Sequence, residues 1–161
     1  MLFRSVGDHL PNVTFTVMTS DGPKPKTTDE VFKGKRVVLF ALPGAFTPTC
    51  DRNHLPSYRD NAAAIKAKGI DTIACLSVND AFVMGAWAKS SNAQDVVEFL
   101  ADGSGIFTIG IGMALDLTER GMGIRSKRYS MLVEDGVVRS INLEENPGIA
   151  ISGAENILTQ L

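Results

Sequence analysis

The segment that most constrains the fold is a short, nearly continuous apolar run at residues 36–42, Arg-Val-Val-Leu-Phe-Ala-Leu. It follows Gly34 and ends at Pro43-Gly44, where regular structure is interrupted. A run of this kind is typical of a strand buried on both faces of a partly parallel sheet, because a half-exposed strand alternates with polar residues. Residues 70–78 form a second such run. Together they predict an α/β fold.

The residues around these runs predict alternating strands and helices. Residues 13–18 alternate as expected for an edge strand, and Asp135-Gly136 is a strong signal for a two-residue hairpin turn. The Ser152 to Glu155 spacing predicts a terminal helix that begins with a capping box. Strands are expected at 13–18, 97–101, 128–134 and 137–143, and helices at 28–34, 47–68 with a kink at Pro56, 81–89 and from 152 onward.

Nothing in the sequence divides the chain into separate units. It has no repeat, charge block or flexible linker, so we expect a single domain over residues 1–161. The order of elements predicts a mixed β-sheet flanked by helices on both faces, for which the thioredoxin arrangement is the best-fitting topology. Residues 103–127 give the least clear pattern.

The charge distribution argues against several classes of partner. Lys and Arg number 16 and Asp and Glu 18, and the only local basic cluster, residues 125–128, is short and lacks interleaved aromatics. Nucleic-acid binding is therefore disfavoured. The longest uncharged stretches, residues 37–50 and 103–115, are interrupted by Pro or Gly and are too short to span a bilayer. With no apolar signal segment at its start, the protein is expected to be cytoplasmic and free of membrane partners.

Cys50 is the first candidate for chemistry. Two cysteines do not make a disulfide framework, and a chain of 161 residues can bury a core without disulfides or a metal. If Thr47 is the N-cap and Pro48 the first helical residue, Cys50 is the third, where free N–H groups and the helix dipole favour a thiolate. The alternative is that Cys50 is only a small buried apolar residue.

Residues 43–50 also carry the pattern Pro-x-x-x-Thr-x-x-Cys, which resembles the signature of the peroxiredoxins. Residues 54–56, 74–82 and 127–131 extend the resemblance over nearly the whole chain. Together these motifs are similar to the type II peroxiredoxins, a peroxiredoxin-5-like group of the thioredoxin superfamily that includes plant type II enzymes and the mammalian atypical two-cysteine enzyme. The resemblance implies a thioredoxin-like fold, peroxidase activity, a homodimer, and no metal or organic cofactor.

The resemblance also implies roles for four residues: Cys50 as the peroxidatic cysteine, Thr47 as the hydroxyl that bonds the peroxide, Pro43 as a shield, and Arg128 as the guanidinium beside the thiolate. Attack of a thiolate on a peroxide moves charge from sulfur to the leaving oxygen, so fixed donors are needed at both ends. Thr47 could also be a plain helix cap, and the two roles are compatible.

From the residues alone, the roles of Arg128 and His54 stay open. Without the resemblance, Arg128 could not be chosen over Arg52 or Arg125, and it could be an exposed charge. His54, four residues after Cys50, could share its helical face, but two Cys and two His without a Cys-x-x-Cys motif make a zinc site unlikely. We interpret His54 as a residue behind the site or on the surface.

Cys75 has two readings. It lies in the middle of an apolar strand, where a free cysteine is more often inert core. The resemblance implies that plant type II enzymes carry a second cysteine here, which makes Cys75 a possible resolving thiol. The mammalian enzyme resolves with a cysteine near the C-terminus, where residues 148–153 of this chain contain no thiol. We interpret Cys75 as a core residue rather than an obligate resolving thiol.

The leading functional hypothesis is a thiol peroxidase. It would reduce hydrogen peroxide or alkyl hydroperoxides through a sulfenic acid on Cys50, with glutathione and glutaredoxin, or thioredoxin, as reductant. The alternative is a redox sensor or holdase without significant turnover, whose output is a binding event. The absence of an appended binding region favours the enzyme.

Overall fold

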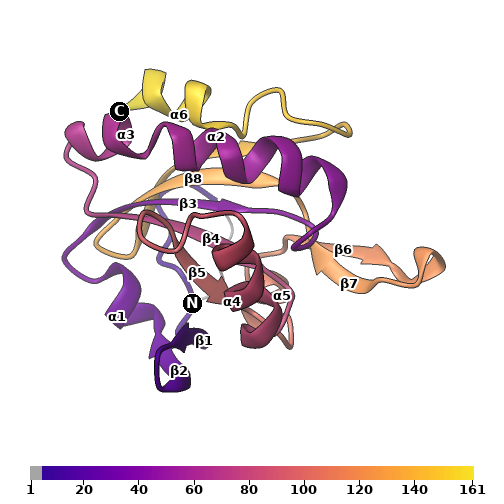
Figure 1. Ribbon diagram of the computed structural model, residues 1–161. Coiled ribbons are helices and arrows are strands. Elements are labelled where there is room, and N and C mark those ends of the chain that lie inside the picture. The colour runs from indigo at the N-terminus through magenta and orange to yellow at the C-terminus, as the bar shows by residue number, and fades with distance from the viewer. Residues whose placement is uncertain (1–4) are drawn as a thin grey trace.

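The computed structural model describes residues 5–161. Its centre is a seven-stranded mixed sheet in the order β2-β1-β5-β4-β3-β8-β9 (Figure 1). The strands are β1 (Thr14–Thr19), β2 (Gly22–Thr27), β3 (Arg36–Ala41), β4 (Thr72–Ser77), β5 (Glu98–Ala101), β8 (Tyr129–Glu134) and β9 (Val137–Leu143). The helices are α1 (Thr28–Phe32), α2 (Leu55–Asp60), α3 (Ala62–Ala67), α4 (Ala81–Ser90), α5 (Ile106–Gly110) and α6 (Ala154–Gln160).

The predicted buried strand is the centre of the sheet. β3 pairs in parallel with β4 and antiparallel with β8, and β4 pairs in parallel with β5. Side chains of β3 enter two different cores: Val38 and Phe40 face one, Val37 and Leu39 the other. This confirms that the apolar run is buried on both faces.

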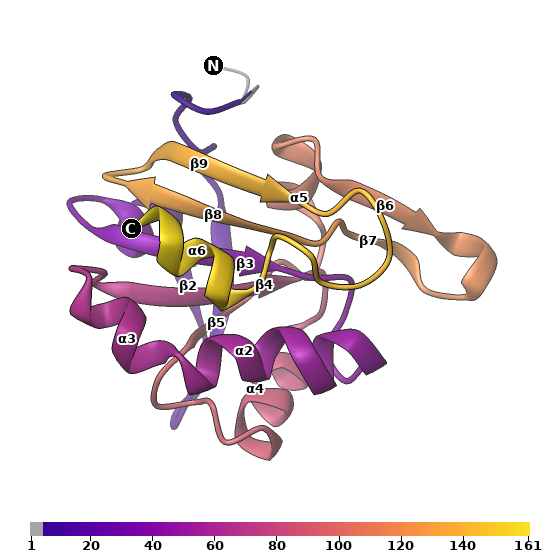
Figure 2. The same cartoon turned by 90° about the horizontal axis from the view of Figure 1, so that it is seen from above.

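Helices cover both faces of the sheet, as predicted. Side chains of α2, α3, α4 and α6 pack in the core that contains Phe40, whereas α1 and α5 pack in the core that contains Leu39. In Figure 2, α6 lies in front of the strands, and α2, α3 and α4 lie together beside them. The active-site candidates Cys50 and Cys75 belong to this first core.

The edge of the sheet differs from the prediction. β1 was expected to be the edge strand, but β2 pairs with it on one side and β5 on the other. β2 itself contains Pro23 and Pro25, which lack the N–H needed to bond a further strand, so the proline-bearing segment occupies the edge. Its Gly-Pro-Lys-Pro-Lys sequence hides this strand from a search for apolar alternation.

The turn between β8 and β9 confirms the hairpin prediction. Asp135 and Gly136 both have positive φ, 51° and 77°, as a type I′ turn requires. The uncertain residues 103–127 contain α5 and a second hairpin, β6 (Ala114–Leu117) and β7 (Gly123–Ser126), joined by the 3₁₀ turn Thr118–Arg120. This second hairpin projects from the body of the molecule (Figure 1).

The start of α6 corrects a prediction. The expected capping box is absent: Gly153 is the N-cap, and the hydroxyl of Ser152 donates to Glu144 at 2.6 Å. The N–H of Ala154 bonds instead to the hydroxyl of Ser57 in α2, at 2.8 Å. A side chain from another helix thus takes over the capping role, which sequence spacing cannot reveal.

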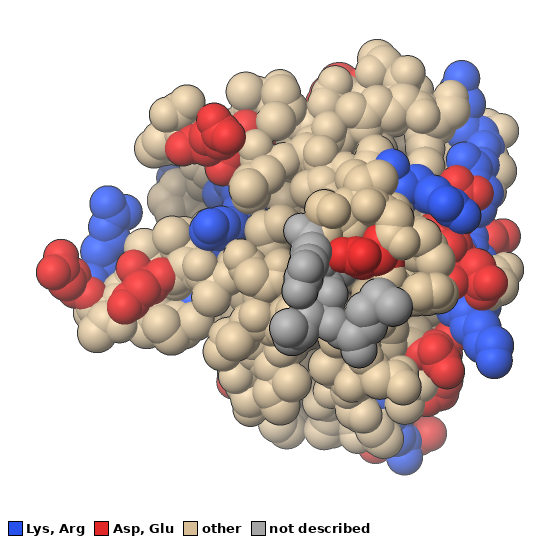
Figure 3. Space-filling model, turned by 180° about the vertical axis from the view of Figure 1, so that it is seen from behind, with Lys and Arg blue, Asp and Glu red and all other residues tan. Residues whose placement is uncertain are grey.

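Charged side chains are mixed on the surface. On the face shown in Figure 3, acidic and basic groups lie beside one another, mostly toward the margins. Among the described residues, no helix combines the length and apolar character that a membrane crossing would need.

Candidate active site

Cys50 lies where the chain leaves β3 and enters a helix. The N–H of Asp51 donates to the carbonyl of Thr47 at 2.8 Å, which makes Cys50 the third residue of the helical segment, as predicted. The Thr47 hydroxyl does not cap the helix: it donates to the Gly44 carbonyl at 2.6 Å. Cys50 is fully buried, so its sulfur is shielded from bulk water.

The helix around Cys50 is not a regular α-helix. Residues Cys50–His54 form a π turn, in which the N–H of Leu55 donates to the Cys50 carbonyl. A kink was predicted at Pro56, because proline lacks an N–H and its ring crowds the carbonyl four residues earlier. The wider turn lies directly before Pro56, in the region where this crowding would fall, and π turns of this type are frequent at functional sites.

Arg128 reaches Cys50 from the neighbouring strand. β8 runs antiparallel to β3 with Tyr129 opposite Ala41, so the residue before β8 lies beside the end of β3. The Nη2 atom of Arg128 donates to the Sγ atom of Cys50 at 3.2 Å, and its Nη1 atom lies 2.9 Å from Nδ1 of His54. A guanidinium held by two contacts can stabilise negative charge on the sulfur.

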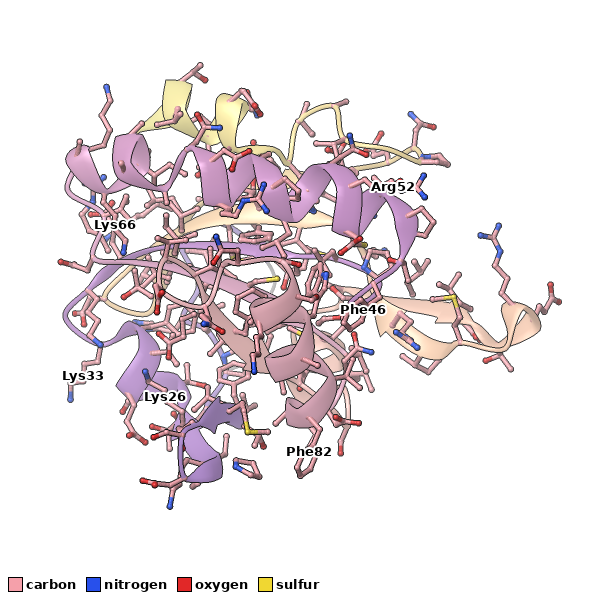
Figure 4. All side chains as sticks on the ribbon, in the orientation of Figure 1. Lys26, Lys33, Phe46, Arg52, Lys66 and Phe82 are labelled. Carbon is pink, nitrogen blue, oxygen red and sulfur yellow. The ribbon has the colours of Figure 1, made fainter. Side chains whose placement is uncertain are left out.

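The contacts of Arg128 distinguish it from Arg52 and Arg125, the other two arginines considered for this role. Arg125 donates through Nη1 to the Pro43 carbonyl at 3.2 Å and through Nε to the Met122 carbonyl at 2.8 Å, so it links β7 to the loop before Cys50. Arg52 is exposed and points away from the protein (Figure 4). Of the three, only Arg128 contacts the thiol.

His54 is buried behind Arg128 and not on the surface. Its Nε2 atom lies 3.0 Å from the carbonyl of Ser152. Because a carbonyl only accepts, Nε2 carries the ring proton and Nδ1 is free to accept from Arg128. Burial, together with the charge of Arg128, lowers the pKa of His54 to about 3, so the ring is neutral at physiological pH.

The loop before Cys50 is held by residues that the sequence analysis did not single out. The Asn79 side-chain oxygen accepts from the N–H of Ala45 at 3.0 Å and from the hydroxyl of Ser77 at 2.6 Å, which ties the loop to the end of β4. Phe46 has a positive φ of 64°, uncommon for a bulky residue. It is half exposed beside Trp87, with ring centroids 6.4 Å apart (Figure 4).

Comparisons with known proteins identify the family of the chain. Residues 5–158 match the Redoxin family. The chain is 47% identical to chloroplastic peroxiredoxin-2E of Arabidopsis thaliana over 98% of its length and 69% of that protein. It is 42% identical to peroxiredoxin-2D of the same plant, over 98% of both chains. The chain belongs to the type II peroxiredoxins.

A solved structure supports the same placement of this peroxiredoxin. Reduced Prx3 of Vibrio vulnificus, solved in complex with hydrogen peroxide, superposes with a TM-score of 0.93 and is 46% identical over 98% of this chain and 99% of the other. The predicted thioredoxin-like α/β fold is thereby confirmed. Like its relatives, the protein is a thiol-dependent peroxidase.

The second cysteine of this peroxiredoxin lies in the same core as the first. Cys75 is in β4, opposite Phe40 of β3, and it is fully buried. Burial raises the pKa of Cys75 well above its ordinary value, and the charge of Cys50 adds to this effect. Burial and the raised pKa both favour the protonated thiol of Cys75 over its thiolate.

Within residues 5–161, no group of three or more His, Cys, Asp or Glu side chains is arranged to hold a metal ion. His54 is occupied by Arg128 and Ser152, at opposite nitrogens of its ring. The spacing from Cys50 to His54 is the sequence signal for this residue, and both side chains contact Arg128.

Proposed function

We propose that Cys50 is the peroxidatic nucleophile of this enzyme and that Arg128 holds its thiolate. The observation that carries the proposal is the contact of 3.2 Å between Nη2 of Arg128 and Sγ of Cys50. A guanidinium stays charged at all relevant pH values, and a hydrogen bond to sulfur favours the thiolate over the thiol. The thiolate is the reactive form of a cysteine.

In the proposed reaction, the Cys50 thiolate attacks the terminal oxygen of hydrogen peroxide or an alkyl hydroperoxide. The sulfur–oxygen bond forms as the oxygen–oxygen bond breaks, giving a sulfenic acid and a hydroxide or alkoxide that takes a proton and leaves as water or alcohol. Arg128 is positioned to donate to the reacting oxygens as negative charge moves onto them. Sulfur is oxidised by two electrons and the peroxide is reduced.

Thr47 and Pro43 are proposed to orient and shield the peroxide. The Thr47 hydroxyl uses its proton on the Gly44 carbonyl, which leaves its oxygen lone pairs to accept from the peroxide O–H. Pro43 is half buried at the end of β3, and its carbonyl is held by Arg125. A fixed apolar ring at this place limits the access of water to the thiolate.

An external thiol is proposed to complete the cycle. A thiol of glutathione would attack the Cys50 sulfenic acid, releasing water and forming a mixed disulfide that glutaredoxin reduces; thioredoxin is the other candidate reductant. The burial of Cys75 and its raised pKa support an external rather than an internal resolving thiol.

Assembly and location are further parts of the proposal. We propose a homodimer, supported by large apolar side chains that are exposed in the single chain, Phe82 at 67% and Ile106 at 64%. Sedimentation analysis of the purified protein tests it, and a monomer at micromolar concentration would contradict it.

A cytoplasmic location is also part of the proposal. Both thiols are free, as is typical of proteins in a reducing compartment. Cell fractionation can test this location.

Steady-state peroxide consumption tests the proposed function. The purified enzyme is assayed with glutathione plus glutaredoxin and, separately, with thioredoxin plus its reductase. We expect many equivalents of peroxide to be consumed per enzyme with at least one of these systems. Consumption of only a stoichiometric amount with both would instead indicate a redox sensor.

A further inference from the structure

A ring of hydrogen bonds connects Arg128 to the loop that precedes α6. The backbone N–H of Glu144 donates to the carbonyl of Arg128 at 3.0 Å. The Ser152 carbonyl accepts from His54 at 3.0 Å, and His54 in turn accepts from the Arg128 guanidinium at 2.9 Å. The Glu144 carboxylate closes the ring by binding the loop that contains Ser152.

The contacts of this carboxylate are concentrated on one oxygen. Oε2 of Glu144 accepts from three successive backbone N–H groups, those of Ala150 at 2.9 Å, Ile151 at 2.9 Å and Ser152 at 2.7 Å. It also accepts from the Ser152 hydroxyl at 2.6 Å. Successive N–H groups that converge on one point form an anion-binding nest, here filled by the protein's own side chain.

The charge state of Glu144 matches these contacts. Partial burial alone would raise its pKa, but hydrogen bonds from Ser152, Ile151 and Ala150 outweigh it and leave the pKa below the ordinary value. The side chain is therefore an anion at neutral pH. A neutral group would hold the loop less strongly, because hydrogen bonds to a charged acceptor are about twice as strong as neutral ones.

We propose that Glu144 is a positioning residue for the peroxidase site: its carboxylate fixes the Ser152 carbonyl, which sets the tautomer and orientation of His54, which in turn aims Arg128 at Cys50. This inference rests on the proposed role of Arg128. Glu144 contacts neither the peroxide nor the thiol. It acts through the loop that contains Ser152 and through the imidazole of His54.

The geometry explains why the fixed carbonyl matters. Ser152 also accepts from the Tyr58 hydroxyl at 2.6 Å, so its carbonyl is held between two donors in the core. If the loop moved, His54 would lose the partner that keeps its proton on Nε2, and Nδ1 would no longer be reserved as an acceptor for Arg128. A shift of a catalytic group by about 1 Å is enough to cost roughly 100-fold in rate.

The test compares Glu144→Ala and Glu144→Gln with the matched control Glu145→Ala, which changes the exposed neighbouring glutamate. Oxidation of Cys50 by hydrogen peroxide and its reduction by the thiol are measured separately. We expect kcat/KM for peroxide to fall by about 10- to 100-fold in Glu144→Ala and by less in Glu144→Gln, which keeps one acceptor oxygen. The value of kcat/KM for the reductant should stay within about twofold of the wild-type value, because this step does not use the aim of Arg128 at the peroxide.

A second measurement begins with the wild type, so that arm does not depend on how well the variants fold. Nitrogen-15 NMR of the wild-type His54 ring should show a neutral ring protonated at Nε2, and Glu144→Gln should show partial loss of that signature. A wild-type ring protonated at Nδ1, or a Glu144→Ala enzyme with the peroxide kcat/KM of Glu145→Ala, would overturn the inference. A wild-type enzyme that consumes no peroxide beyond a stoichiometric amount would contradict the proposed function, and not the role of Glu144 alone.

Discussion

The indole Nε1 of Trp87 donates to the Asp51 carboxylate at 2.7 Å, joining α4 to the residue that follows Cys50. The only tryptophan of the chain is thus bonded to the π turn that carries the nucleophile. This contact gives the reaction a built-in spectroscopic reporter, since indole emission responds to its hydrogen-bond partner.

Oxidation of Cys50 should therefore change Trp87 fluorescence. In stopped-flow mixing with peroxide, we expect an emission change in the wild type and a smaller amplitude in Asp51→Ala, because that indole loses its acceptor in the π turn. Cys50→Ser, which cannot be oxidised at this position, is the control and should give no change. Equal amplitudes in the wild type and Asp51→Ala would show that the bond does not report on the turn.

Replacing Arg128 should slow the oxidation step itself. Arg128→Met removes the donor that lies 3.2 Å from the sulfur, and we expect the second-order rate with hydrogen peroxide to fall by about two orders of magnitude or more. Arg52→Met, at an exposed position, is the matched control and should stay near the wild-type rate. An Arg128→Met enzyme as fast as this control would remove Arg128 from the mechanism.

The stability of the protein should fall in mild acid because of His54. Its ordinary pKa of 6.5 is lowered to about 3 in the folded state, so the unfolded chain takes up a proton first as the pH drops. Stability is full above about 6.5 and is lost toward pH 3, by roughly 2 kcal/mol between pH 7 and pH 5. Urea unfolding measures this, and His54→Gln should show a shallower dependence in that range. An equal dependence would mean that other groups carry it.

Much of the fold could be predicted because local patterns and tertiary packing agree. The strand at residues 36–42 is apolar at successive positions since both of its faces are buried. Asp135-Gly136 supplies the two positive φ angles that the hairpin needs. β2 escaped prediction because an edge strand with prolines needs little apolar surface, and its position is set by pairing with β1.

The site was predictable as far as it is local in sequence. Cys50 and Thr47 lie on one short segment. The position of Cys50 in the first turn of a helix, where free N–H groups favour a thiolate, identifies it as the reactive cysteine. Arg128 is 78 residues away, so only the family resemblance selected it, and the pairing of β3 with β8 explains its place. The Glu144 carboxylate binds backbone N–H groups of a loop, and Ser152 contributes its backbone carbonyl. Contacts to the backbone leave no residue-specific signal in a single sequence.

Cys75 should be dispensable when an external thiol is present. Its burial in β4 and its raised pKa predict that Cys75→Ser keeps most of the turnover with glutathione and glutaredoxin. Mass spectrometry of peroxide-treated wild type without added thiol should find sulfenic or sulfinic acid on Cys50 and a free Cys75. A stoichiometric disulfide between the two cysteines, with lost turnover in Cys75→Ser, would make Cys75 the resolving thiol.

The most direct test is peroxide consumption by Cys50→Ser, measured beside Cys75→Ser under identical reductant conditions. A serine hydroxyl is not ionised at neutral pH, so the variant keeps the shape of the site but lacks the nucleophile. We expect Cys50→Ser to be folded by circular dichroism and to consume no peroxide above background, while Cys75→Ser remains active. Turnover by Cys50→Ser near the wild-type rate would contradict the assignment of Cys50 as the peroxidatic residue.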